Sequence, residues 1–193
     1  MDYGDNHTHP RNLLRDIHYK IMASKTSSVF YLRKAVETDG TGFESANIDI
    51  SAYIDTLKGN VLRINQVWFE WTSDSGAPIE TADVGVDKTC SAVAQLTTES
   101  QTATQPLSNT SLFAKHQIYH TTDNQSGTNN FIMIHEDAAM NPADFNDGFL
   151  VANDTIQLGL AMSTSPHDYA NDLRCSVLLE CEQVKMSASD AQA

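Results

Sequence analysis

The stretch Asn47-Ile-Asp-Ile-Ser-Ala-Tyr-Ile-Asp-Thr-Leu-Lys-Gly-Asn-Val-Leu-Arg-Ile-Asn-Gln-Val-Trp-Phe-Glu-Trp71 decides the fold class. Residues 47–51 alternate as a short strand does, and residues 52–59 predict a compact bend or a single helical turn that Gly59 ends. Residues 61–71 then form the strongest strand pattern of the chain. Strand, bend and strand in such close succession indicate an all-β protein.

Side chains in the second half of the 61–71 strand divide into two faces, because successive residues of a strand point to opposite sides of a sheet. We expect the more apolar face to lie in the core and the other face to point away from it. The core set is Val67, Phe69 and Trp71, and the opposite set is Gln66, Trp68 and Glu70.

Further strand patterns follow along the chain, separated by turn-forming Asn, Asp, Gly, Ser and Pro. No repeat of fixed period and no glycine-rich turn from strand to helix interrupts them, which argues against solenoids and nucleotide-binding α/β folds. The sequence therefore predicts a jelly-roll β-sandwich of about eight strands. Besides the strands at 47–51 and 61–71, the expected strands are 29–36, 84–86, 89–96, 112–121, 130–135, 149–152, 156–162 and 173–186. The last of these places Cys175, Val177, Leu179 and Cys181 on one face.

The beginning of the chain differs from the rest in charge and period. Residues 1–35 hold six Lys and Arg against three Asp, a net charge of +3. Residues 36–193 carry a net charge of −16, and the two parts add to the total of −13. An amphipathic helix is expected over about residues 10–23, as part of an N-terminal arm of residues 1–26. The helix either caps its own core or packs on a neighbouring subunit. Candidate contact residues in it are Arg11, Leu13, Leu14, Arg15, Ile17, Lys20 and Ile21.

The charge balance restricts the partners of the body, which is expected to be one domain of residues 27–186 followed by a polar tail, 187–193. A strongly acidic body lacks the Lys and Arg that phosphate binding needs, so strong nucleic-acid binding is not expected of it. No signal peptide and no apolar run long enough to cross a bilayer are expected either. The three cysteines are expected to be reduced thiols, mostly buried.

No motif predicts catalysis, a cofactor or a metal, and the chain is not expected to be an enzyme. His116 and His120 lie four apart, about 13 Å on a strand, which is too far to share one metal, although a helix would bring them together. The loop 136–148 contains Asp144, Asn146 and Asp147, a fragment of a calcium-loop pattern that lacks the required glycine and bidentate glutamate. A solvated loop is the favoured interpretation and a calcium site the alternative.

Residues 47–71 resemble the early strands of single jelly-roll capsid proteins of small icosahedral viruses, which often show a short "I-D-I-S" strand, a bend and a long "V-L-R-I" strand. Gly148-Phe-Leu-Val-Ala-Asn-Asp-Thr-Ile-Gln-Leu-Gly is a second similarity, a loop before a late strand. The resemblance covers about a fifth of the chain. It implies a structural virion protein, made in the host cytoplasm, whose arm runs inside the shell.

The first hypothesis is therefore a capsid subunit that binds copies of itself and other virion proteins. Its arm would contact an inner membrane or the genome. The alternatives are a lectin-like β-sandwich that stacks a sugar on Trp68 or Trp71, and a cupin-type metalloenzyme that uses His116, His120 or His135.

Overall fold

A computed structural model describes residues 24–38, 42–79, 88–125, 129–162 and 172–187, with the backbone alone for 88–90, 120–125 and 129–136. Most of this part is strand. Three single 3₁₀ turns, η1 Ser51–Tyr53, η2 Thr56–Lys58 and η3 Pro142–Asp144, are its helical segments, and no helix of the described part could span a membrane. The strands are β1 Ser24–Lys25, β2 Phe30–Thr38, β3 Phe43–Asp49, β4 Asn60–Ser73, β5 Lys88–Thr97, β6 Leu112–Gln125, β7 Asn129–Met140, β8 Phe149–Val151, β9 Thr155–Met162 and β10 Leu173–Lys185.

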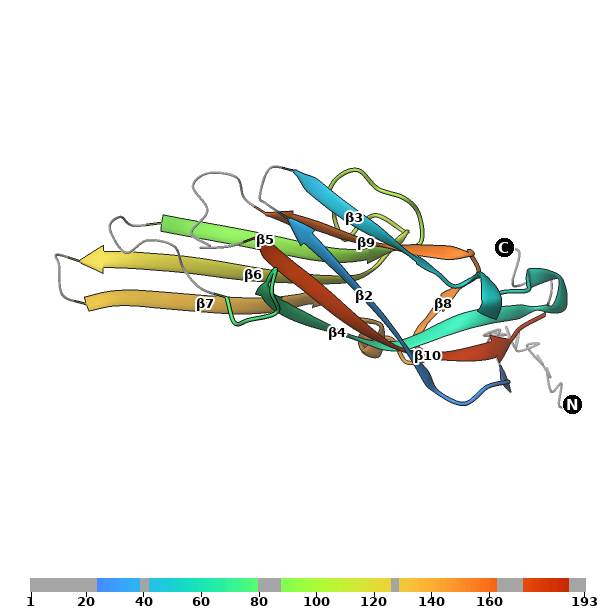
Figure 1. The fold of residues 1–193 in the computed structure, drawn as a ribbon. Helices are drawn as coiled ribbons and strands as arrows, with labels where there is room; N and C mark the ends of the chain where they lie inside the picture. Colours follow the sequence, from blue (N-terminus) through green and yellow to red (C-terminus); the bar gives the residue numbers. More distant parts are fainter. Residues whose placement is uncertain (1–23, 39–41, 80–87, 126–128, 163–171, 188–193) are drawn as a thin grey trace, which may run out of the picture.

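The strands pair from the two ends of the chain inward, all antiparallel. β2 pairs with β10, β3 with β9, β4 with β8, and β5 with β6, so the chain is one long hairpin rolled up on itself. Rolling produces two sheets: sheet A, ordered β2-β10-β4-β8 with β1 also on β10, and sheet B, ordered β3-β9-β5-β6-β7 (Figure 1). This arrangement is the jelly roll, so the predicted fold class of an all-β jelly-roll sandwich is confirmed.

The strand predictions agree with the structure in type and differ from it in length. β6 and β7 are longer than the two strands expected there, and β7 takes up the first residues of the expected 136–148 loop. In Figure 1 these two strands extend beyond the end of β4. Ser24–Lys25, inside the segment 1–26 expected to be an arm, pair with β10 as β1. The expected strand at 84–86 and the expected helix over residues 10–23 lie outside the described residues.

The long strand β4 changes phase at one residue. Leu62 and Ile64 are fully buried, and so is Val67, three residues further on. Strict alternation would place Val67 on the opposite face from Ile64. The register explains this burial, because Cys181 of β10 faces Ile64 while Glu180 faces Gln66, which leaves Asn65 as an extra residue. Such a β-bulge keeps the apolar residues of both halves of β4 directed into the sandwich.

The beginning of β8, Phe149, lies against this bulge. β8 pairs with β4 only as far as Ile64, and beyond it the side chain of Asn141 takes the place of a strand. Its Nδ2 donates to the carbonyl oxygen of Val67 at 2.6 Å, and its Oδ1 accepts from the N–H of Val67 at 3.2 Å. Gly148, just before β8, has a φ of 67°. A Cβ at this position would lie 2.6 Å from the carbonyl oxygen of Ile64.

The interior between the two sheets is mainly aliphatic, and the rings of Phe113 and Phe149 stack within it. β10 contributes Cys175, Val177, Leu179 and Cys181, each at most 2% exposed and all on the face expected from the sequence. Burial, and secondarily the charge of Glu180, raises the pKa of the Cys181 thiol to about 12. Burial also raises the pKa of Cys175. Thiolate is the reactive form of cysteine, so both side chains act as apolar core residues at neutral pH.

The bend between β3 and β4 has the form expected from residues 52–59. Asp55 accepts a hydrogen bond from the N–H of Lys58 at 3.2 Å and pairs with its Nζ at 2.8 Å, and Gly59 ends the turn. These contacts, first the hydrogen bond from the Lys58 side chain, lower the pKa of Asp55.

Gly148 is required for two reasons, its positive φ and the close approach of the Ile64 carbonyl oxygen, and a comparison with Gly76 and Gly42 separates their effects. Gly148→Ala should lower the free energy of unfolding by about 2–4 kcal/mol, because alanine meets both an unfavourable φ and the backbone of Ile64. Gly76→Ala, at a φ of 82° with open space around the added Cβ, should cost about 1 kcal/mol. Gly42→Ala, which meets no atom within 4 Å and lies outside the left-handed region, should stay within about 0.5 kcal/mol of the parent. Urea unfolding of the three variants checks the order, and equal effects at Gly148 and Gly76 would contradict the close approach to Ile64.

Candidate subunit-contact surface

The three longest strands of sheet A turn the same kind of surface outward. Because β2, β10 and β4 pair in continuous register, their outward side chains form rows that run across the strands. We call these twelve positions the outer face. Its four rows, each in the order β2, β10, β4, are Tyr31–Glu180–Gln66, Arg33–Leu178–Trp68, Ala35–Ser176–Glu70 and Glu37–Arg174–Thr72.

Aromatic side chains are unusually open on this face. Tyr31 is 49% exposed and Trp68 is 40% exposed, and their rings lie 6.5 Å apart. Leu178 is on β10 between the strands that carry them, and Val29, 39% exposed, precedes β2. In a sandwich the outward positions of a sheet are ordinarily polar, so this group of apolar side chains indicates a surface that binds something.

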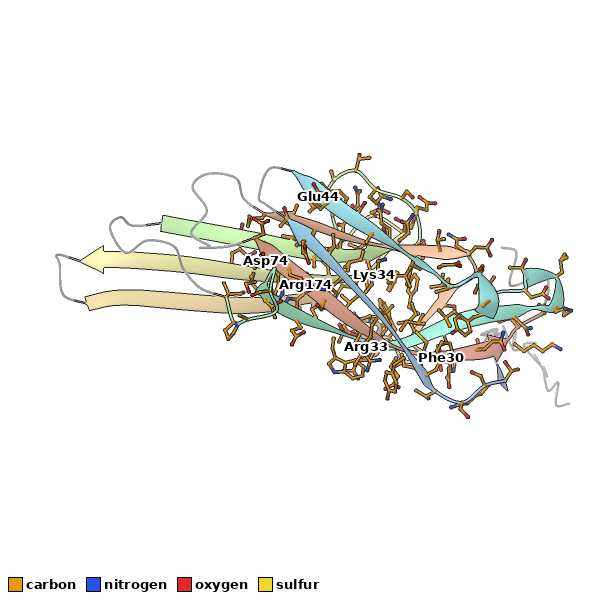
Figure 2. All side chains as sticks on the ribbon, in the orientation of Figure 1. Phe30, Arg33, Lys34, Glu44, Asp74 and Arg174 are labelled. Carbon is orange, nitrogen blue, oxygen red and sulfur yellow. The ribbon has the colours of Figure 1, made fainter. Side chains whose placement is uncertain are left out.

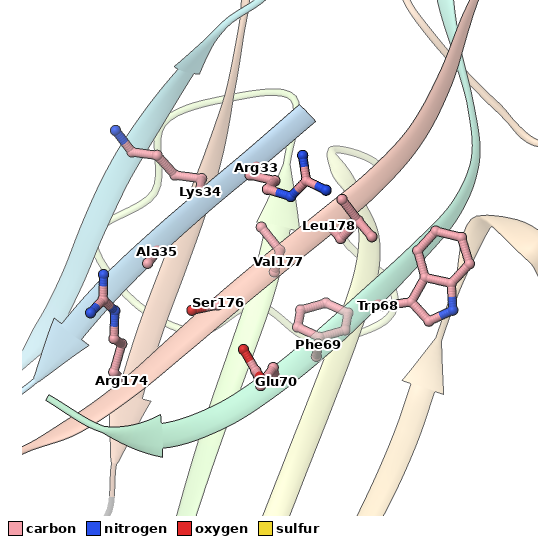
Figure 3. A pocket seen from close by; sticks show the side chains of 10 residues that line it. All are labelled: Arg33, Lys34, Ala35, Trp68, Phe69, Glu70, Arg174, Ser176, Val177 and Leu178. Carbon is pink, nitrogen blue, oxygen red and sulfur yellow. The ribbon is translucent and has the colours of Figure 1, made fainter. Parts of the chain in front are cut away.

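Beside the aromatic group the outer face is hollowed. Ala35 and Ser176 have small side chains, and they form the floor between the row of Leu178 and the row of Arg174. Figure 3 shows Ser176 between Leu178 and Arg174 along β10, with Glu70 on the neighbouring strand. The hollow has a volume of about 780 Å³. Its lining residues are Arg33, Lys34, Ala35, Trp68, Phe69, Glu70, Arg174, Ser176, Val177 and Leu178.

Charges of both signs surround the hollow, and they are only loosely engaged within the chain. Arg174 donates from Nη1 to the carbonyl oxygen of Asp74 at 3.3 Å, and its Nε lies 3.6 Å from the carboxylate of Glu37. Glu180 accepts from the Tyr31 hydroxyl at 3.4 Å. Distances of this length correspond to weak interactions at a solvated surface. The outer face thus combines exposed aromatic rings with arginine, the residue types that protein–protein interfaces favour, and its glutamates can pair with arginines.

Trp71 faces the interior, opposite to Trp68, and has a polar partner there. Its Nε1 donates to Nδ1 of His116 at 2.9 Å, and the imidazole of His116 stacks on Phe69 with ring centroids 5.3 Å apart. Both Phe69 and Trp71 are partly buried and pack against the main core cluster, in which Val67 is 2% exposed. An inward indole cannot serve as a sugar platform, which leaves Trp68 as the tryptophan available for stacking.

The positions considered for a metal are placed as follows. His116 lies on strand β6, so the helical spacing that would bring it to His120 does not occur. The side chains of His120 and His135 lie outside the described ones. In the loop considered as an alternative calcium site, Asp144 Oδ2 accepts from the N–H of Asn141 at 3.0 Å and caps the η3 turn. Within the described residues, no group of three or more His, Cys, Asp or Glu is placed to hold a metal ion.

Sequence reasoning placed Gln66, Trp68 and Glu70 on the outward side of their strand and missed the part of the outer face that β2 and β10 supply. The arm residues that it named instead, Arg11 to Ile21, lie outside the described residues. A signal for the outer face was present in β10, where Leu178 interrupts the polar phase of the alternation between Ser176 and Glu180. Register then brings Arg33 and Trp68 beside Leu178, and register between distant strands cannot be obtained from one sequence.

Comparisons with known proteins give a likeness in shape alone. No family model matches the chain, and no curated protein matches it. Similar solved structures include VP1 of Trichodysplasia spinulosa-associated polyomavirus in complex with 3'-sialyllactose, at 10% identity and a TM-score of 0.40, covering 85% of this chain and 98% of that one. The unassembled pentamer of Merkel cell polyomavirus VP1 is another, at 9% identity and a TM-score of 0.39, covering 86% and 99%. These belong to the class that the sequence resemblance named, jelly-roll capsid proteins, and the proposals below rest on the strand order and the outer face instead.

The two tryptophans provide a matched test of the inward and outward assignments. Trp71→Phe should lower the free energy of unfolding by about 1–3 kcal/mol, because it removes the donor to His116 and leaves unfilled space beside it. Trp68→Phe should change it by no more than about 0.5 kcal/mol, because that ring is open to solvent. Urea unfolding at low protein concentration measures both, and a larger loss at Trp68 than at Trp71 would reverse the assignment.

Proposed function

We propose that this chain is a structural virion protein, a jelly-roll capsid subunit that self-assembles into a closed icosahedral shell. The observation that carries the proposal is the outer face: a jelly-roll sheet that exposes Tyr31 and Trp68, beside the half-buried Leu178, among arginines and glutamates. A structural subunit needs a rigid body with such contact surfaces and needs no reaction. The sequence resemblance of residues 47–71 to capsid proteins points to the same role, with the virion as the location.

Assembly of such subunits depends on geometry and on charge. Closed shells form when each rigid body repeats the same few contacts at fixed angles. The segment after residue 35 carries a net charge of −16, so neighbouring copies repel one another. Salt screens this repulsion between charges that lie more than a Debye length apart, which is about 10 Å at 0.1 M ionic strength. Assembly is therefore expected to need moderate salt, or a cationic partner such as the basic arm of a neighbour.

The arm leaves the body at a buried ion cluster. Lys25 of β1 pairs with Glu182 at 2.9 Å, and Arg63 donates to the other oxygen of Glu182 at 3.2 Å. Glu182 is only 7% exposed, so these cations compensate a carboxylate that burial would otherwise disfavour. The cluster fixes the first described residues to sheet A. A truncation that ends at residue 23 therefore keeps the attachment point and removes only the segment before it.

Deletion of residues 1–23 tests the shell and the arm together. The full chain should form uniform closed particles in negative-stain images, at a salt concentration found by titration. The truncated chain should keep its β-rich circular dichroism spectrum and its cooperative unfolding, and should give few or no closed particles. A full chain that stays monomeric under every condition would exclude the shell. A truncated chain that assembles normally would exclude a role for the arm, and one that fails to fold would show that the arm completes its own core.

A second candidate function is carbohydrate binding at the same hollow. Trp68 lies at its edge with an exposed ring, and Arg33, Arg174, Glu70 and Ser176 supply donors and acceptors around it. Sugar rings stack on tryptophan while polar side chains bind their hydroxyl groups. On this reading, binding to a glycan array is lost in Trp68→Ala and kept in Trp71→Phe. Signals that are equal in the parent and in Trp68→Ala, or no signal at all, would exclude this function.

A further inference from the structure

We propose that the outer face of sheet A binds the outer face of a second copy of this chain, across a two-fold axis that runs perpendicular to the strands and passes over Val177. This two-fold contact rests on the proposed function in one respect, because it would be one of the contacts through which capsid subunits associate. The two β10 strands then cross antiparallel at the centre of the interface. A second copy of this chain is inferred as the partner because the charges of the four rows are opposite to those that the same four rows present after the two-fold rotation.

The two-fold axis superposes the rows in reverse order. The row of Arg33, Leu178 and Trp68 meets the partner's row of Ala35, Ser176 and Glu70, so the tall side chains of one copy enter the hollow of the other. Leu178 enters over Ser176, and the Trp68 indole N–H meets the carboxylate of Glu70. Ridge and hollow therefore fit each other, as an isologous contact requires.

The outer two rows meet in the same way and pair opposite charges. Arg174 of each copy lies over Glu180 of the other, and the Tyr31 hydroxyl lies over the carboxylate of Glu37. Among the described residues, Arg174 and Glu180 have the long contacts given above, at 3.3–3.6 Å, so both keep hydrogen-bonding capacity for a partner. Symmetry makes each contact occur twice.

Three other two-fold axes bring like charges together. An axis parallel to the strands would place Arg174 on Arg174 and Glu180 on Glu180. An axis over Ser176 would place Glu70 on Glu70, and an axis over Leu178 would place Arg33 on Arg33. Like charges opposite each other in an interface cost several kcal/mol, so the axis over Val177 is favoured over these three.

The expected strength follows from the size of the contact. Packed sheets lie about 10 Å apart with strands inclined by about 30°, so the centre fits closely and only long side chains meet at the ends of β10. A standard interface takes about 20–30 residues a side, more than the twelve positions of the outer face. We therefore expect a dimer that dissociates at about micromolar concentration and that other contacts reinforce in a shell.

A charge exchange between Arg174 and Glu180 tests the axis. Sedimentation velocity of the full chain over a range of concentrations should resolve a 21.2 kDa monomer in equilibrium with a dimer of twice that mass. Arg174→Glu and Glu180→Arg should each raise the dissociation constant by about tenfold or more, because each places two like-charge pairs in the interface. The double variant R174E/E180R restores the opposite pairing and should recover most of the dimer.

Controls separate this surface from others and from loss of fold. Glu44, exposed on β3 of sheet B (Figure 2), receives the matched reversal Glu44→Arg, which should leave the dimer unchanged. Ser176→Trp fills the hollow without a change of charge and should also abolish the dimer. Circular dichroism melts check that each variant is folded.

Each result bears on one of the two proposals. A monomer at all concentrations, or a dimer that Arg174→Glu and Ser176→Trp leave intact, would overturn the two-fold contact even if shells form. A dimer that the single reversals break and the double variant restores supports the contact. If no closed particle forms from that dimer, the shell fails while the contact stands.

Discussion

The position of β10 between β2 and β4 is the constraint on which the rest of the structure depends. Its inward side chains supply one wall of the core, and both of its edges are paired along most of their length. The bulge at Asn65 is a consequence, since it keeps Leu62 and Val67 of β4 inward against the same strand. Asn141 and Gly148 then complete the edge of β4 where β8 begins. The single extra residue Asn65 thus lies where the edge of β4 changes from pairing with β8 to hydrogen bonds with Asn141.

The same pairing produces the outer face. Alternation along β10 directs Cys175, Val177 and Leu179 inward and leaves Ser176 and Leu178 outside. β2 and β4 then place Arg33 and Trp68 beside Leu178 by register. Inner core and outer contact surface are therefore two sides of one set of strands. A residue inserted into β10 would exchange them, because a shift by one position reverses every side chain.

Local pattern was sufficient to predict the strands, the turn ended by Gly59 and the inward face of β10, because each depends on neighbours in sequence. The phase change in β4 was readable in principle from the polar pair Asn65-Gln66 between two apolar alternations, yet its cause is the register with Cys181. The extra length of β6 and β7 has no local signal, since polar side chains there read equally as loop or strand. Nor could the outer face be predicted, because Arg33, Trp68 and Leu178 come from three distant segments that only strand register brings together.

The central strand is also the last strand to be made. Ser73 pairs with Leu173, a hundred residues later in the chain, so β4 leaves the ribosome well before its partner exists. At about 5–20 residues per second, this interval lasts about 5–20 s. During it β2 and β4 have no common neighbour, and the outer face lacks its middle column. Completion of β10 therefore closes the sandwich and completes the outer face in one event. The order of strands thus acts as a timer, because no chain presents the complete outer face before its sandwich is closed.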